Sequence, residues 1–263
     1  GVIEGHDWAG GDPDKYLSED GTFKTITGTV GGAALVIAAS DAPTYVKDHA
    51  YDVCTGTNDH VKINDALALG SVQLTTGHYY PGDSILNQVT NRLINGEGNQ
   101  TQITTSGAFP VVRFHAATVS LVSCGISNLA IVATGSNVPA CLKFTRSGAN
   151  EITQFLSTHV NLVGAQKQLW VLDTPIRYHS LGGSFEYGPA GAVGIYANIG
   201  DFVLYSTWFE SMERRIDAFG DCSFRLVSPK TANIVSPDGL TQVLGYTPIV
   251  KEDDARGPWY VKE

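Results

Sequence analysis

Two glutamates stand at matching positions of two similar segments. Glu186 ends the segment Gly182-Gly-Ser-Phe-Glu, and Glu210 ends Ser206-Thr-Trp-Phe-Glu. If these segments are neighbouring strands of a repeat, the two carboxylates stack about 5 Å apart, the spacing between adjacent strands. That separation suits a retaining glycosidase, because one carboxylate can attack while the other, with its pKa raised by the nearby charge, donates a proton. A solvated or turn-stabilising stack of side chains stays open as the plainer interpretation.

A second polar group comprises Asp173, Arg177 and His179, in the stretch Leu172-Asp-Thr-Pro-Ile-Arg-Tyr-His. An arginine could serve as the base of a polysaccharide lyase while an acid holds calcium, whose preferred ligands are oxygens. No run of calcium-binding aspartates can be matched beside these residues. A polar loop without a catalytic role is therefore the alternative.

Aromatic residues gather in the same part of the chain. They are Trp170, Tyr178, Tyr187, Tyr196, Tyr205 and Trp208. Aromatic faces pack against sugar rings, and polar neighbours such as Asn198 and Asp201 could fix sugar hydroxyls, so all eight residues are candidates for substrate binding. The alternative is aromatic stacking inside the fold or between subunits.

The elements that would position these residues are short strands that recur along the chain. Strands are expected to begin near Val111, Cys141, Leu169, Gly194 and Arg215. In addition, the segment Gly194-Ile-Tyr-Ala-Asn-Ile-Gly-Asp aligns with Arg215-Ile-Asp-Ala-Phe-Gly-Asp. Repeats of roughly 20 to 30 residues built from several strands indicate a solenoid. Helical and leucine-rich repeats are excluded because neither the helical stripe nor the leucine spacing is present. The remaining class is an all-β parallel β-helix, which we expect to be right-handed and single-stranded.

One helix is expected near residue 60, before the repeats. Thr57 or Asn58 could cap it, Asp59 would lie in its first turn, and Gly70 could end it. Placed at the N-terminal end of the β-helix, this helix would cover the first open strand edge. We expect three regions: an extended collar over residues 1–45, the β-helix over 46–230, and an extended linker over 231–263.

The bulk composition narrows the class of partner. The 263 residues are 43% hydrophobic but only 16% charged, with 29 glycines, which favours a β-rich fold with many turns. The net charge is −9 without a lysine or arginine cluster, so nucleic acid is not an expected partner. No apolar run is long enough for a membrane span, and no signal peptide is visible.

The four cysteines form no CxxC pair, so we expect buried free thiols and neither a metal nor another cofactor. Because the sequence begins without Met, we also expect it to be a piece of a longer protein.

Motifs in both flanking regions resemble those of phage tail fibres. The stretch Leu244-Gly-Tyr-Thr-Pro-Ile-Val-Lys-Glu-Asp-Asp is similar to the "LGYTPVNKAGD" linker repeat, although the family usually has Gly before Asp. Tyr16-Leu-Ser-Glu-Asp-Gly-Thr-Phe resembles the "FLRGDGTW" element, and its turn signal Asp20-Gly21 lies between two β-prone pieces. The preceding His6-Asp-Trp-Ala-Gly-Gly-Asp-Pro is similar to the His- and Gly-rich segment that often accompanies it.

The start of the body resembles another family. Thr57-Asn-Asp-His-Val-Lys-Ile-Asn-Asp-Ala-Leu, then Val72-Gln-Leu and Arg92-Leu-Ile-Asn-Gly-Glu-Gly-Asn-Gln-Thr, are similar to the N-terminal end of pectate-lyase-like β-helices, which include many phage tailspikes. Together the resemblances imply an extracellular protein of the virion tail surface, normally a homotrimer attached to other tail proteins. The leading hypothesis is a receptor-binding protein for host surface polysaccharide. A depolymerase that cleaves the polysaccharide and a structural spacer are the alternatives.

Overall fold

The computed structural model describes the backbone of residues 15–17, 23–25, 34–234, 240–242 and 250–253, and the side chains of residues 34–229. The chain divides into two compact units, residues 1–33 and 34–263. In the first unit, β1 (Lys15–Leu17) pairs antiparallel with β2 (Phe23–Thr25). This pairing confirms the two predicted short strands, whereas the Asp20-Gly21 turn between them lies outside the described residues.

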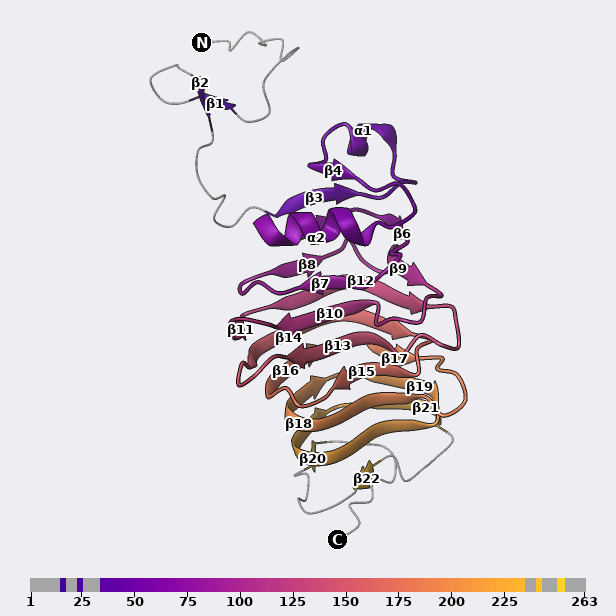
Figure 1. Ribbon diagram of the computed structural model, residues 1–263. Coiled ribbons are helices and arrows are strands. Elements are labelled where there is room, and N and C mark those ends of the chain that lie inside the picture. The colour runs from indigo at the N-terminus through magenta and orange to yellow at the C-terminus, as the bar shows by residue number, and fades with distance from the viewer. Residues whose placement is uncertain (1–14, 18–22, 26–33, 235–239, 243–249, 254–263) are drawn as a thin grey trace, which may run out of the picture. The chain divides into compact units, whose positions relative to one another are not determined.

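The second unit is mostly β-structure, and every strand pairing among its described residues is parallel. Figure 1 shows the strands stacked one beneath another from β3 to β20. They form three ladders, which we call faces 1, 2 and 3. The chain passes through faces 2, 3 and 1 in turn, and we call one such pass a coil. An all-β parallel fold is therefore confirmed.

The bounds of the strands follow the order of the faces. Face 1 consists of β6 (Gly77–Tyr79), β9 (Thr101–Thr105), the second halves of β12 (Gly125–Ala133) and β14 (Ile152–Val163), β17 (Ser184–Glu186), β19 (Trp208–Met212) and β21 (Lys230–Ile234). Face 2 consists of β7 (Ile85–Asn87), β10 (Val112–Ala116), β13 (Ala140–Arg146), β15 (Lys167–Val171), the first halves of β18 (Val193–Tyr205) and β20 (Arg214–Val227), and β22 (Leu240–Gln242).

Face 3 begins with the first strands of the unit. It consists of β3 (Leu35–Ala38), β4 (Asp52–Val53), β5 (Val72–Leu74), β8 (Leu93–Asn95), β11 (Leu121–Val122), the first halves of β12 and β14, β16 (Ile176–Leu181), the second halves of β18 and β20, and β23 (Val250–Asp253). The parallel sheet thus starts at residue 35 and includes strands after residue 230. It extends beyond residues 46–230 at both ends.

The register confirms the repeat that the sequence predicts. On face 2, Val112 pairs with Leu142, Leu142 with Leu169, Leu169 with Ile195, and Ile195 with Ile216. These pairs lie at or next to the predicted strand starts. The alignment of Gly194–Asp201 with Arg215–Asp221 also holds up to Ala197, after which a bulge shifts the register.

Aromatic rings fill the interior. Phe155 contacts Phe114 and Phe144 edge-on, with ring centres 4.7 Å apart in both pairs, and stacks on Tyr178 at 5.6 Å. Strand β16 alternates strictly between buried and exposed side chains, which places Tyr178 inside at 1% exposure. The prediction that Tyr178 binds substrate is therefore wrong, because a ligand cannot reach a core residue.

Two helices lie near the start of the sheet, α1 (Thr44–Lys47) and α2 (His60–Leu69). Helix α2 is the predicted one, and it buries Ile63, Ala66 and Leu67. It ends at Gly70 as expected. At its N-terminus the prediction is wrong, because the capping position is Asp59 rather than Thr57 or Asn58.

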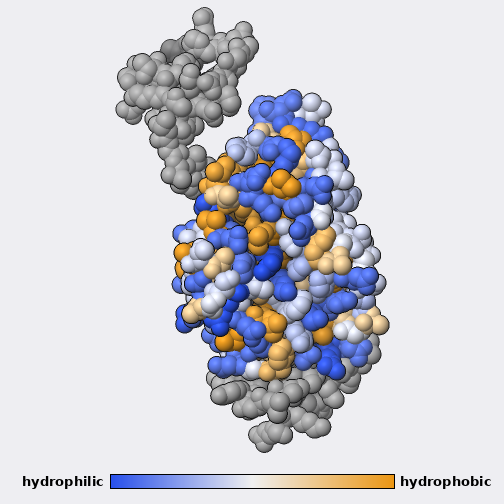
Figure 2. Space-filling model, viewed as in Figure 1, coloured by the Kyte–Doolittle hydropathy of each residue, from blue (hydrophilic) through white to orange (hydrophobic). Residues whose placement is uncertain are grey.

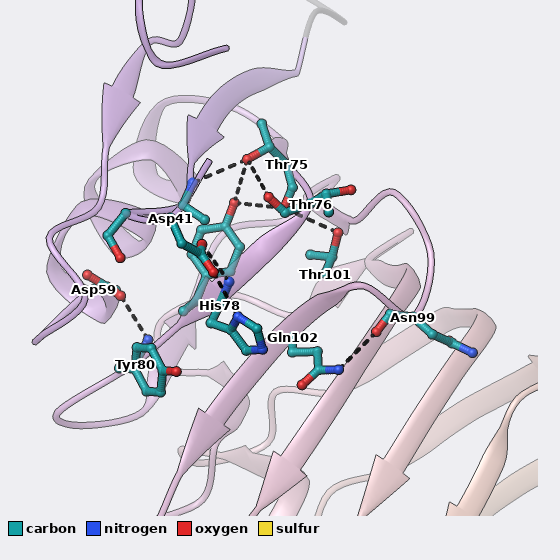
Figure 3. A network of polar contacts seen from close by, with 12 residues as sticks. Asp41, Asp59, Thr75, Thr76, His78, Tyr80, Asn99, Thr101 and Gln102 are labelled. Atoms are coloured by element: carbon teal, nitrogen blue, oxygen red, sulfur yellow. Dashed lines mark hydrogen bonds and ion pairs between the residues drawn. The ribbon is translucent and has the colours of Figure 1, made fainter. Parts of the chain in front are cut away.

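Asp59 instead ties the start of α2 to the loops around it. The buried carboxylate accepts hydrogen bonds from the backbone N–H groups of Thr55, Gly56 and Tyr80, at 3.0, 3.0 and 2.8 Å. Beside it, the Tyr79 hydroxyl donates to the carbonyl of Ile37 at 2.8 Å. Figure 3 shows the bond from Tyr80 to Asp59 within the polar network at the first coils. It supplies partners for polar groups that would otherwise be buried unpaired.

Candidate functional site

Glu186 and Glu210 are neighbours on face 1. They are register partners on β17 and β19, together with the buried pair Phe185 and Phe209, whose ring centres lie 5.0 Å apart. The phenylalanines anchor the two strands in the core, and the period of two along a strand turns the glutamates outward. Both glutamates are half-buried. The predicted adjacency of Glu186 and Glu210 in neighbouring coils is therefore confirmed.

Two exposed aromatic residues frame this acidic pair. The Trp208 indole N–H donates to the Glu210 carboxylate at 3.1 Å, and 37% of Trp208 is exposed. Tyr187 is 55% exposed, and the charges of Glu210 and Glu186 raise the pKa of its phenol. Face 1 thus presents two carboxylates, an indole and a phenol together. Such a set can hydrogen-bond sugar hydroxyls and pack against a sugar ring.

The other predicted pair of aromatics, Trp170 and Tyr196, lies on face 2. The two are register partners on β15 and β18, both half-buried, with ring centres 6.4 Å apart. Their surroundings differ from those on face 1, because cations cover them. The Lys143 ammonium lies 3.6 Å from the centre of the Trp170 ring, and Lys167 lies 5.1 Å from Trp170 and 5.0 Å from Tyr196.

Further cations continue the outward column on face 2. Arg113 is the register partner of Lys143 in the preceding coil, and its Nε donates to the Thr145 hydroxyl at 2.9 Å. Beside the column is a groove of about 440 Å³. Its lining includes Arg113, Lys143, Thr145, Arg146, Leu172 and Asp173. Sequence reasoning did not find these cations, because they are close in space but far apart in the chain. The strand register would have revealed them, because it makes Lys143 the register partner of Trp170.

Asp173 and Asn198 hold a turn together. The Asn198 amide donates to the Asp173 carboxylate at 2.6 Å, and the Asp173 backbone N–H donates to the Asn198 side-chain oxygen at 2.8 Å. Asp173 has a φ of 55°, a conformation that Asn and Asp tolerate better than most residues. Their mutual bonds account for both side chains without a ligand. The structure therefore favours the polar-loop interpretation of Asp173 and a turn-stabilising role for Asn198.

Arg177 and Asp201 are register partners on β16 and β18. They line a groove of about 450 Å³ together with Glu151 and Asp221. Asp201 also accepts a hydrogen bond from the Ser223 hydroxyl at 2.5 Å. His179 is exposed and Tyr205 half-buried, and both lie on face 3. The three residues predicted as an alternative catalytic group, Asp173, Arg177 and His179, are thus not gathered into one site: Asp173 lines the face 2 groove, whereas Arg177 lines this one.

The described residues contain no group of three or more His, Cys, Asp or Glu side chains arranged to hold a metal ion. In the same part of the chain, no helix has the length and apolar character needed to cross a membrane. All four cysteines are buried and unpaired, as predicted. Comparison with known proteins found no matching family model, curated protein or solved structure.

Proposed function

We propose that this protein is a receptor-binding component of a phage-type tail fibre or tailspike, and that it binds a polysaccharide of the host surface. Support comes from the fibre-like motifs in both flanks and from the stacked parallel strands between them. We further propose that this stack is a right-handed parallel β-helix of the pectate-lyase-like kind. Helix α2, with its buried apolar side beside the first strands, would be its N-terminal cap.

The observation that carries the binding proposal is the group on face 1. Trp208 and Tyr187 are exposed, the Glu210 carboxylate accepts a hydrogen bond from the Trp208 indole, and its charge raises the pKa of Tyr187. An aromatic surface with fixed hydrogen-bonding groups beside it is the usual composition of a sugar site. Because neighbouring coils repeat about every 4.8 Å, such a site can continue along the stack and engage an extended polymer.

Figure 2 agrees with this view of the surface. On the side that it shows, the coloured residues present hydrophobic side chains as small patches among hydrophilic ones. A surface of this mixed kind suits sugars, which offer both hydroxyl groups and apolar ring faces.

The test is retention of purified protein on immobilised envelope polysaccharides from a panel of bacterial hosts. We expect one polymer to retain the protein, and Trp208→Ala to weaken retention about tenfold, the loss of roughly 1.4 kcal/mol. Tyr45→Ala is the matched control, because Tyr45 is a 71% exposed aromatic residue on α1, far along the chain from Trp208. Retention by no polymer would leave the structural-spacer alternative.

A second candidate function, depolymerisation, is favoured by the adjacency of Glu186 and Glu210. In that case the retained polymer would shorten over time, and Glu186→Gln or Glu210→Gln would stop the shortening without stopping retention. A glycosidase needs both groups, so each single variant is informative. Binding without any shortening by the unmodified protein would reject this candidate and keep the receptor-binding one.

We also propose that the protein acts as a homotrimer on the extracellular virion surface, joined to other tail proteins. Support comes from face 3, where Leu93, Leu156 and Leu181 are 47%, 43% and 41% exposed. Exposed apolar residues in one region are typical of a surface that another subunit covers. Light scattering tests the assembly, since a trimer has three times the mass of the 28.0 kDa chain. A mass of one chain would count against the trimer.

A further inference from the structure

On face 2, the ring of Trp170 contacts the ammonium group of Lys143. The Lys143 ammonium lies 3.6 Å from the ring centre, well within the roughly 6 Å of a cation–π interaction. The indole Nε1 is buried and has no hydrogen-bond partner among the described residues. A ligand arriving at this position therefore meets the ammonium group before it meets the ring. The aromatic side chain fixes where that positive charge is held.

The positive charges around Trp170 outnumber the carboxylates beside them in the described part of the chain. Arg113, Lys143, Arg146 and Lys167 form no ion pair with a carboxylate of residues 34–229. Burial, followed by the charges of Arg113 and Lys167, lowers the pKa of Lys143. The cations thus repel one another in a protein whose net charge is −9.

The nearby acids do not remove this excess. Asp217 continues the column below Tyr196, where it is paired with Arg214 at 3.3 Å and also attracts Lys167. Asp173 lines the groove, and its bond to the neutral Asn198 amide leaves its carboxylate charged, so it offsets only part of the positive charge there. An arrangement of like charges costs free energy unless an anion arrives, and a bound anion would have two or more cations as neighbours.

We propose that face 2 binds the anionic groups of a polysaccharide, with Lys143 and Arg113 as the contacting residues and Trp170 as the residue that positions Lys143. This inference rests on the proposed function and adds to it the chemical class of the polymer. Charged groups repeated along the polymer would meet Arg113 and Lys143 in successive coils and the groove beside them. Carboxylates of uronic acids and phosphates of sugar-phosphate polymers share the required chemistry.

The experiment measures the affinity of purified protein for three soluble probes: polygalacturonate, poly(glycerol phosphate) and neutral dextran. We expect at least one anionic probe to bind, with affinity falling as salt rises, and dextran to bind more than tenfold more weakly. Arg113→Gln/Lys143→Gln should lower affinity at least tenfold. The control Lys47→Gln/Arg225→Gln also removes two positive charges, but from α1 and face 3, and should change affinity less than twofold. Comparison of the two anionic probes separates carboxylate from phosphate recognition.

Trp170→Leu tests the positioning role. It keeps both cations but removes the ring, so affinity should fall while the salt dependence stays that of a two-cation site. Thermal melting of every variant verifies folding.

The proposal is overturned if dextran binds as well as the anionic probes, if neither anionic probe binds, or if the face 2 double variant behaves like its control. If the protein retains a neutral host polysaccharide and the face 2 substitutions do not change that retention, this inference is wrong and the proposed function is kept. If no polymer is retained, both this inference and the proposed binding function are wrong.

Discussion

Glu186 and Glu210 are register partners in adjacent coils, and the phenol of Tyr187 responds to the charge of both. The pair is not isolated, because Trp208 donates to Glu210 from the same strand. Two negative charges that are held side by side disfavour a further negative charge nearby. The pKa of Tyr187 is therefore a measure of the charge on Glu186 and Glu210.

The first prediction concerns this coupling. The carboxylate of Glu210 is the largest cause of the raised pKa of Tyr187, because a negative charge disfavours a second one on the phenol. Glu210→Gln should therefore lower the pKa of Tyr187 toward its ordinary value of 10.0, and Glu186→Gln should lower it less. Tyrosinate absorbance, measured as the difference between each variant and the same variant with Tyr187→Phe, isolates this one phenol. An equal pKa in all three proteins would contradict the assignment.

The repeat and the pairing of Glu186 with Glu210 could be predicted from the sequence, because similar residues occupy equivalent positions in neighbouring coils. Phe185 and Phe209 occupy the same inward position in two coils of similar composition, so the alignment of residues is also an alignment in space. The inward position of Tyr178 was equally readable, since Arg177 and His179 alternate with it along β16. Counting aromatic residues without assigning them to a side of the strand gave the wrong prediction there.

The cations of face 2 required information that residue spacing does not contain. The loops between strands differ in length from coil to coil, and a bulge after Ala197 shifts the register again. Only the assembled pairing brings Arg113, Lys143 and Trp170 into one column. The absence of a basic run in the chain therefore did not exclude a basic surface.

The second prediction concerns the turn that Asn198 and Asp173 share. Asn198→Ala removes two hydrogen bonds, including the partner of a backbone N–H, so it should lower the free energy of unfolding by about 1–3 kcal/mol. Asn99→Ala is the control, because Asn99 is exposed and accepts the Gln102 hydrogen bond through its backbone carbonyl, so the loss there should stay within about 0.5 kcal/mol. Urea unfolding measures both. Equal stabilities of the two variants would argue against a structural role for Asn198.

The third prediction concerns the interior aromatic cluster. Phe155 is fully buried and contacts three other rings, so Phe155→Ala should lower the free energy of unfolding by about 3–5 kcal/mol through lost contacts and a cavity. Phe155→Leu retains most of the volume and should lose clearly less. Chemical denaturation with coincident fluorescence and circular dichroism transitions provides the comparison. If the two substitutions cost the same, the ring contacts are not what stabilises this part of the core.

The fourth prediction concerns the thiols. Burial raises the pKa of Cys141 to about 12, and burial together with nearby carboxylates raises those of Cys54 and Cys222 to about 12. Since the thiolate is the reactive form, a raised pKa and a buried position both slow reaction with a thiol reagent. At pH 8 the folded protein should therefore show almost no labelling, and the unfolded protein should show all four thiols. Ala149→Cys, at an exposed position, should add one rapidly labelled thiol to the folded protein and so verify the reagent. Rapid labelling of the unmodified folded chain would mean that a cysteine is accessible, contrary to the burial of all four.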